Sequence, residues 1–146
     1  MRKIQLSAPV FNNKEINAAI KTIKSLNISQ GKKVLEFENQ FSSYLGSKYG
    51  IATNSGSSAN LIALTALKEF YNLKNGDEVI IPAATFATVA MPIIQIGLKP
   101  VYTDIDLNSY NISPIEIEKA ISKKSKIIML VHTLGNPANM AEISKI

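Results

Sequence analysis

The apolar residues of this chain first recur at helical spacing. In residues 14–26 they fall every three or four positions, which predicts a helix with one apolar face. A turn over residues 27–31 separates it from a second predicted helix, which ends at Gly46, a residue typical of helix C-termini. The predicted buried side of this second helix consists of Val34, Phe37, Phe41, Tyr44 and Leu45. Residues 1–11 contain a proline and are expected to be extended.

From residue 49 onwards, short apolar runs alternate with helical patterns. The runs that predict strands are residues 49–53, 78–81, 100–103 and 126–131. The predicted helices are residues 58–71, 86–96 and 114–123, and a last one that begins at 139. Strands that alternate with helices are typical of an α/β protein, with a mostly parallel sheet and helices on both faces.

Most of the unusual residues follow the predicted strands. The loops concerned are residues 54–58, 82–86, 104–106 and 132–137. The carboxyl ends of parallel strands meet at one edge of the sheet, and ligands of such sheets bind there. We therefore look for a functional site among these four loops.

The loop over residues 54–58 is rich in serine and leads into an alanine- and leucine-rich helix. Gly56 allows a tight turn, and Ser57 or Ser58 can cap the helix. The free N–H groups and the dipole at a helix start favour an anion, phosphate above all. The loop is no P-loop, because no Gly-Lys-Ser/Thr follows, and it lacks the glycines of a dinucleotide fingerprint. An ordinary turn with serine as cap is the alternative.

The other loops allow two interpretations each. Phe86 can stack on a flat heteroaromatic ligand or belong to the core. Asp104 and Asp106 can form a carboxylate pair or a cation site, although a solvated turn is the more common arrangement. His132 can act as a general base or serve in hydrogen bonding and packing. No metal site is assigned.

Composition narrows the function classes. The chain has 146 residues, 46% hydrophobic and 18% charged, as expected for one soluble globular domain. It has no cysteine, which excludes disulfides and thiolate chemistry. It has a single histidine, His132, which excludes a metal site built from several histidines. The net charge of +5 comes largely from scattered lysines without a nucleic-acid-binding motif, so we expect no nucleic acid partner. Without a membrane-spanning run or a signal peptide, the expected location is the cytoplasm.

Taken in order, these segments resemble the DegT/DnrJ/StrS family of pyridoxal-phosphate-dependent sugar aminotransferases. The motifs are Ser29-x-Gly31, Phe37-Glu38-x-x-Phe41, Leu45-Gly46-x-Lys48-Tyr49, Asn54-Ser55-Gly56-Ser57-Ser58-Ala59-Asn60-Leu61, Gly76-Asp77-Glu78-Val79-Ile80, Pro82-x-x-Thr85-Phe86-x-x-Thr88, Gly97-x-x-Pro100-Val101-Tyr102-x-Asp104-Ile105-Asp106 and the turn from His132 to Pro137. The resemblance covers nearly the whole chain. It implies the large domain of the aspartate-aminotransferase type (pyridoxal-phosphate fold type I) and a homodimer.

The resemblance also implies a cofactor, pyridoxal 5'-phosphate or pyridoxamine 5'-phosphate. Gly56, Ser57 and Ser58 would hold its phosphate, Phe86 would stack on its pyridine ring, and Ser29 would lie near the substrate. The family's Schiff-base residue is expected beyond Ile146, so no catalytic residue is named.

Residues 1–146 are therefore expected to be the N-terminal part of a truncated cofactor-binding large domain. Residues 1–48 would be a helical arm and 49–146 the βα units. Truncation would leave a sheet edge and the apolar faces of Val34, Phe37 and Phe41 uncovered, which predicts self-association or low solubility. A clean monomer in light scattering at micromolar concentration would contradict this expectation.

The implied activity is transfer of an amino group, with glutamate as the expected donor, to a nucleotide-linked keto-sugar in cell-surface polysaccharide (lipopolysaccharide) or deoxyamino-sugar biosynthesis. Two motifs, residues 54–60 and 132–137, look more like the pyridoxamine-phosphate-dependent nucleotide-sugar 3-dehydrases, whereas Pro82-x-x-Thr85-Phe86 is more typical of the aminotransferases. The aminotransferase is preferred as the larger class. A 3-dehydrase and a non-catalytic remnant are the alternatives, and a lysine, a histidine or a stop codon beyond Ile146 would separate the three.

Overall fold

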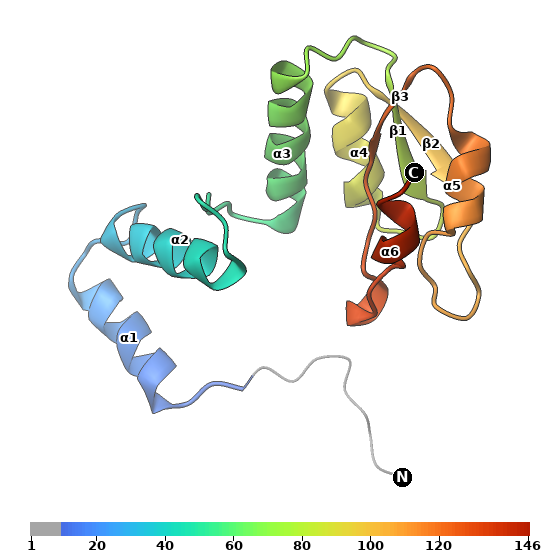
Figure 1. Cartoon of the computed structure of the whole chain (residues 1–146). Coiled ribbons are helices and arrows are strands. Elements are labelled where there is room, and N and C mark those ends of the chain that lie inside the picture. Colours follow the sequence, from blue (N-terminus) through green and yellow to red (C-terminus); the bar gives the residue numbers. More distant parts are fainter. Residues whose placement is uncertain (1–9) are drawn as a thin grey trace. The chain divides into compact units, whose positions relative to one another are not determined.

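The computed structural model describes residues 10–146, which fall into two compact units, and the boundary between them in the sequence lies between Ala52 and Thr53 (Figure 1). The expectation that residues 1–11 are extended therefore lies almost wholly outside the described residues. Within the described part of the chain, every helix is too short or too polar to cross a membrane. The two units are described separately below.

The first unit contains the two predicted helices, α1 (Asn13–Lys24) and α2 (Lys32–Leu45). Asn12 caps α1 through a reciprocal pair of hydrogen bonds. Its side chain accepts from the N–H of Lys14 at 2.8 Å, and its own N–H donates to the Glu15 carboxylate at 2.8 Å. Gly46 ends α2 in the left-handed conformation, with φ of +68°.

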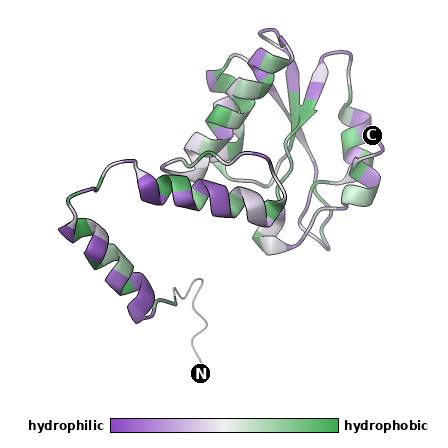
Figure 2. Ribbon diagram, turned by 60° about the vertical axis from the view of Figure 1, so that its left-hand side comes forward, coloured by the Kyte–Doolittle hydropathy of each residue, from purple (hydrophilic) through white to green (hydrophobic). Residues whose placement is uncertain are grey.

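Most of the predicted buried side of α2 is exposed, and only Val34 among its five residues is half-buried. The prediction that this side is buried was therefore wrong, whereas the exposed rings of Phe37 and Phe41 agree with the expectation that truncation leaves them uncovered. The rings of Phe37 and Phe41 stack on each other, with centroids 5.5 Å apart, yet they are 56% and 49% exposed. Tyr44 and Leu45 are exposed as well. Two helices with one apolar stripe each are too few to enclose a core. Figure 2 shows polar and apolar residues alternating around both helices.

The second unit is built on a three-stranded sheet with strand order β2-β1-β3. The strands are β1 (Glu78–Pro82), β2 (Lys99–Thr103) and β3 (Ser125–Ile128). Both pairings are parallel, and Glu78 lies opposite Lys99 on one side and Ser125 on the other. The structure thus confirms a parallel sheet and three of the four predicted strands.

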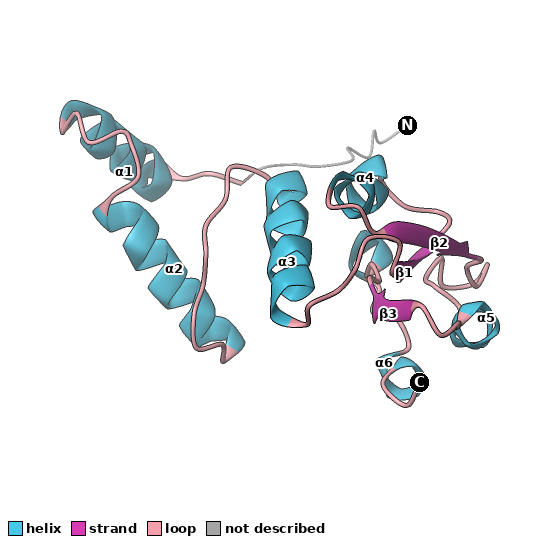
Figure 3. Cartoon of the chain, turned by 90° about the horizontal axis from the view of Figure 1, so that it is seen from above, coloured by secondary structure: helices cyan, strands magenta, loops and turns pink. Residues whose placement is uncertain are grey.

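Helices cover both faces of this sheet, as predicted (Figure 3). The helices are α3 (Gly56–Phe70), α4 (Ala87–Gln95), α5 (Pro114–Ala120) and α6 (Met140–Ile143), with a short 3-10 helix, η1 (Thr133–Gly135). Val79 and Ile81 of β1 pack with α3 and α4 on one face, and Ile80 packs with α5 and α6 on the other. All three side chains are fully buried, as expected for the central strand of a parallel sheet.

Two strand predictions need correction. Residues 49–53 are not a strand, because no strand of the described chain lies beside them to complete a ladder. The N–H of Ala52 donates instead to the Glu38 carboxylate, at 2.8 Å. The last strand was predicted to reach residue 131 but ends at Ile128, although the N–H of Met129 still donates to the carbonyl of Ile80 at 2.9 Å.

Glu78, at the start of β1, has a buried carboxylate that bonds to β2 on one side and to the segment before β3 on the other. Its oxygens accept from the Ser122 hydroxyl at 2.6 Å and from the Lys99 ammonium at 3.0 Å. These two hydrogen bonds hold the pKa of Glu78 below its usual value of 4.5. The depressed pKa means that the ionised form stabilises the fold fully above about pH 4.5, and that this contribution is lost as the pH falls through the lower folded-state pKa.

We predict that Glu78→Gln flattens the acid dependence of stability. Glutamine keeps the shape and can still accept from Ser122, but it has no proton to take up. The free energy of unfolding should be measured with urea at about four pH values between about pH 6 and pH 3. As the pH falls, it should decrease less for the variant than for the wild type. Parallel curves for the two proteins would contradict this account.

Candidate functional site

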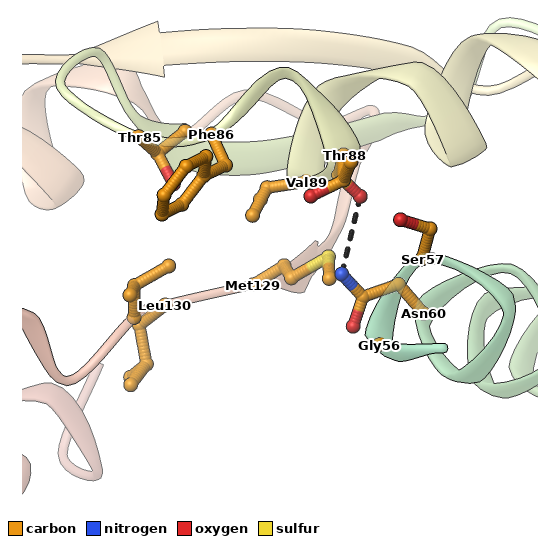
Figure 4. Close-up of a pocket in the computed structure, with 10 residues that line it drawn as sticks. Gly56, Ser57, Asn60, Thr85, Phe86, Thr88, Val89, Met129 and Leu130 are labelled. Atoms are coloured by element: carbon orange, nitrogen blue, oxygen red, sulfur yellow. Dashed lines mark hydrogen bonds between the residues drawn. The ribbon is translucent and has the colours of Figure 1, made fainter. Parts of the chain in front are cut away.

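A cavity of about 490 Å³ lies at the carboxyl-end edge of the sheet. Three segments form its wall: the first turn of α3, the segment from the end of β1 into α4, and the residues that follow β3 (Figure 4). The lining residues are Gly56, Ser57, Asn60, Thr85, Phe86, Thr88, Val89, Met129, Leu130 and Val131. The position agrees with the expectation that ligands of such sheets bind beyond the carboxyl ends of the strands.

The start of α3 presents free hydrogen-bond donors to this cavity. Ser55 is the N-cap, and its hydroxyl oxygen accepts from the N–H of Ser58 at 3.2 Å. The N–H of Ala59 donates to the carbonyl of Ser55 at 3.0 Å. The N–H groups of Gly56 and Ser57 therefore have no acceptor among the described residues, and they lie at the positive end of the helix dipole. This arrangement suits an anion.

The prediction that Ser57 or Ser58 caps the helix was wrong, because α3 begins two residues earlier than expected, at Gly56. The shift changes the roles of the serines. Ser57 stands in the first turn and lines the cavity, whereas Ser58 bonds to Ser55 through its N–H and its hydroxyl, both at 3.2 Å. Ser58 is absent from the cavity lining, so its contact with a phosphate stays a prediction.

Phe86 is the N-cap residue of α4, and its side chain is not part of the core. The residue is 81% exposed and lines the cavity, which excludes the alternative that it is an ordinary core residue. Figure 4 shows the Phe86 ring at one end of the cavity and Ser57 at the other, with Val89 and Met129 between them. The cavity thus has an aromatic end, a donor-rich end and an apolar middle.

The cavity lining carries no charged side chain. An anion bound there would be held by neutral N–H and hydroxyl donors together with the helix dipole. Thr85 adds an unusual group, because its hydroxyl oxygen is buried and has no hydrogen-bond partner within residues 10–146.

The other loops at this edge are held by local hydrogen bonds. The Asp106 carboxylate accepts from the N–H groups of Ser109 and Asn108, and these bonds lower its pKa. The Asp104 carboxylate accepts from the N–H of the next residue at 2.8 Å. Both aspartates therefore serve turns, and the described residues contain no group of three or more acidic or histidine side chains placed to hold a metal ion.

His132 has a structural role here, since its Nδ1 accepts from the N–H of Ala138 at 3.0 Å and closes the turn. Ser29 lies in the first unit, between α1 and α2, and is exposed. Its proposed place near a substrate stays a prediction.

Sequence reasoning missed several residues of the cavity. Asn60 belongs to a motif that the resemblance used, but it received no role. Thr85 was quoted in a motif but received no role, and Val89 and Met129 were not named, because their contribution depends on how α4 and the end of β3 pack against α3. The sequence pattern predicts that the carboxyl ends of the parallel strands lie together at one edge of the sheet. This expectation could have identified Met129 and its neighbours as cavity residues, because they follow β3.

Comparison with known proteins decides the family. The profile of the DegT/DnrJ/EryC1/StrS aminotransferase family matches residues 9–146. The chain belongs to this family. The predicted resemblance is thus confirmed, and so is the predicted fold, the large domain of pyridoxal-phosphate fold type I.

Two curated relatives illustrate the range of the family. GDP-4-keto-6-deoxy-D-mannose 3-dehydratase of Yersinia pseudotuberculosis is 39% identical over all of this chain and 39% of its own length. The dTDP-3-amino-3,6-dideoxy-alpha-D-galactopyranose transaminase of Aneurinibacillus thermoaerophilus is 40% identical over 80% of this chain and 31% of its own. The chain therefore spans about two fifths or less of the length of these relatives.

A solved structure of a relative supports the same family assignment. The Escherichia coli GDP-4-keto-6-deoxy-D-mannose-3-dehydratase, which contains hydrated pyridoxal phosphate, superposes with a TM-score of 0.92 at 36% identity. The match covers 99% of this chain and 38% of that one.

Proposed function

We propose that the second unit binds pyridoxal 5'-phosphate or pyridoxamine 5'-phosphate in the cavity between α3 and α4. The phosphate would accept from the N–H groups of Gly56 and Ser57 and from the Ser57 hydroxyl, and the pyridine ring would stack on Phe86. The observation that carries the proposal is the pairing of free helix-start donors with an exposed aromatic ring in one cavity. Relatives solved with pyridoxal phosphate, and one from Bacillus subtilis solved with pyridoxamine phosphate, support it.

The chemistry of the residues fits this group. A helix start with unpaired N–H groups is suited to a phosphate, and the small side chains there leave room for it. Val89 and Met129 line the space between the two ends and would keep water from the face of the ring. When bound, such a cofactor supplies the electron sink for reactions at carbon atoms next to an amino group or a carbonyl.

We propose amino transfer to a nucleotide-linked keto-sugar as the reaction of the whole protein, with glutamate as donor and a cytoplasmic homodimer as its form. The resemblance to the family and the transaminase among the relatives support the amino transfer in this proposal. A further relative supports a role in making surface polysaccharides, since it is a lipopolysaccharide biosynthesis protein of Salmonella typhimurium, 42% identical over 96% of this chain.

A second candidate is 3-dehydration of such a sugar. It is favoured by the dehydratases among the relatives, including those of Yersinia pseudotuberculosis and Saccharopolyspora spinosa, which are 39% and 38% identical. Both reactions need the same cofactor cavity. The residue at the Schiff-base position beyond Ile146 distinguishes them, because a lysine there supports amino transfer and a histidine supports dehydration.

Phe86 provides a direct test of the ring end of the cavity. We predict that Phe86→Ala weakens binding of pyridoxamine phosphate by about five- to tenfold, the effect of losing one stacking contact. The ring is 81% exposed, so the fold should be nearly unaffected. Pyridoxamine phosphate is the suitable ligand, because the aldehyde of pyridoxal phosphate would react with surface lysines.

Isothermal titration of the 146-residue chain measures this effect. Inorganic phosphate serves as the control ligand, since it has no ring and its affinity should not change. Phe86→Trp keeps an aromatic face and should retain binding. Equal affinity of wild type and Phe86→Ala for pyridoxamine phosphate would show that the ring does not lie on Phe86.

A further inference from the structure

Helix α4 contains a proline in its interior, Pro92. Proline has no N–H, so the carbonyl four residues earlier, that of Thr88, has no donor within the helix. Thr88 stands in the first turn of α4 and lines the cavity. The missing bond therefore falls beside the candidate site.

Asn60 supplies the donor that Pro92 lacks. Its Nδ2 donates to the carbonyl oxygen of Thr88 at 3.1 Å, the dashed line in Figure 4. Asn60 lies four residues after Gly56 on α3, which places both on the same side of the helix. A side chain next to the free donors of α3 thus completes the hydrogen bonding of α4.

We infer that Asn60 is a positioning residue that fixes the first turn of α4 against the first turn of α3. The first turn of α4 follows directly on Phe86, and the first turn of α3 carries Gly56 and Ser57. The Asn60–Thr88 bond therefore sets the spacing between the ring end and the donor end of the cavity. This effect on ligand binding rests on the proposed function, whereas the pairing of Asn60 with Pro92 does not.

Pro92 makes the inference testable. In Pro92→Ala the new N–H can bond to the Thr88 carbonyl inside the helix, so Asn60 is no longer needed there. The effects of Asn60→Ala and Pro92→Ala should then be strongly non-additive, which a double-mutant cycle measures.

The first readout is urea unfolding of the four proteins of this cycle, without ligand. We expect Asn60→Ala to lower the folding equilibrium constant about fivefold in the wild-type background, the effect of one lost hydrogen bond. In the Pro92→Ala background the loss should be less than about twofold. Asn54→Ala is the matched control and should behave alike in both backgrounds, because the side chain of this asparagine before α3 bonds only to Ser55 within residues 10–146. An equal loss for Asn60→Ala in both backgrounds would overturn the pairing.

The second readout separates positioning from direct contact with the ligand. A positioning residue should matter for a ligand that reaches both ends of the cavity and not for one that occupies a single end. Asn60→Ala should therefore weaken pyridoxamine phosphate about fivefold and inorganic phosphate by less than about twofold, and Pro92→Ala should remove the difference.

Each outcome of the titrations has a distinct meaning. An equal loss for both ligands would make Asn60 a direct ligand of the phosphate and overturn the positioning role. A folded wild-type chain that binds no pyridoxamine phosphate would refute the proposed function and, with it, the effect on ligand spacing. The unfolding cycle would still decide whether Asn60 replaces the N–H that Pro92 lacks.

Discussion

Ser57→Asp is expected to abolish binding of pyridoxamine phosphate while making the protein slightly more stable. A carboxylate in the first turn of α3 would stand where the phosphate is proposed to bind, and the lining of the cavity has no positive side chain to offset the repulsion. Two like charges at about 4 Å repel by several kcal/mol near a protein surface, so the affinity should fall by about a hundredfold or more.

The gain in stability has a separate cause. An acidic residue in the first turn of a helix interacts favourably with the dipole, a contribution of about 0.3–1 kcal/mol. Urea unfolding should show this gain, and titration calorimetry should show the loss of binding. Opposite signs in the two experiments exclude misfolding as the reason for lost binding.

A control variant and a control ligand test whether the effect comes from the phosphate. Ser57→Ala removes one hydroxyl but keeps the N–H, and should weaken binding by only about three- to tenfold. Pyridoxamine without the phosphate should bind equally well to wild type and Ser57→Asp. Undiminished affinity of Ser57→Asp for pyridoxamine phosphate would place the phosphate somewhere other than the start of α3.

The largest expected effect on stability comes from Ile93→Ala. Ile93 is fully buried in the cluster that joins α3 and α4 to β1. Truncating such a side chain removes its burial and leaves a cavity, at a cost of about 2–5 kcal/mol. A small domain has only about 5–15 kcal/mol in total, so the variant should lose a large part of its stability.

The neighbouring residue is a matched control. Ile94 has the same side chain, one position along the same helix, but is 52% exposed. Ile94→Ala should cost less than about 1 kcal/mol. Urea unfolding measures both variants, and similar losses for the two would contradict the assignment of α4's buried face.

The sequence predicted the second unit well because its signals are local. The apolar run of β1 is typical of a strand buried on both faces, and the Ser113-Pro114 start of α5 fits the known preferences of helix N-termini. Parallel order then followed from the alternation of strands and helices. The cavity edge could be predicted on the same grounds.

The errors arose where the outcome depends on neighbours. Residues 49–53 have the composition of a strand, but a strand needs a hydrogen-bonded partner, and the described chain has none beside them. Phe37 and Phe41 lie on an apolar face, yet a pattern cannot show whether something covers it. The role of Asn60 was hidden for a similar reason, because its partner, Thr88, is 28 residues away in sequence.

The most direct test of the central claim is an NMR titration of the isotope-labelled 146-residue chain with pyridoxamine phosphate. We predict saturable shifts that are largest at the amides of Gly56 and Ser57 and at the ring of Phe86, with only the two amides responding to inorganic phosphate. Shifts confined to surface lysines, or none at these three residues at saturating ligand, would contradict the proposed cofactor cavity.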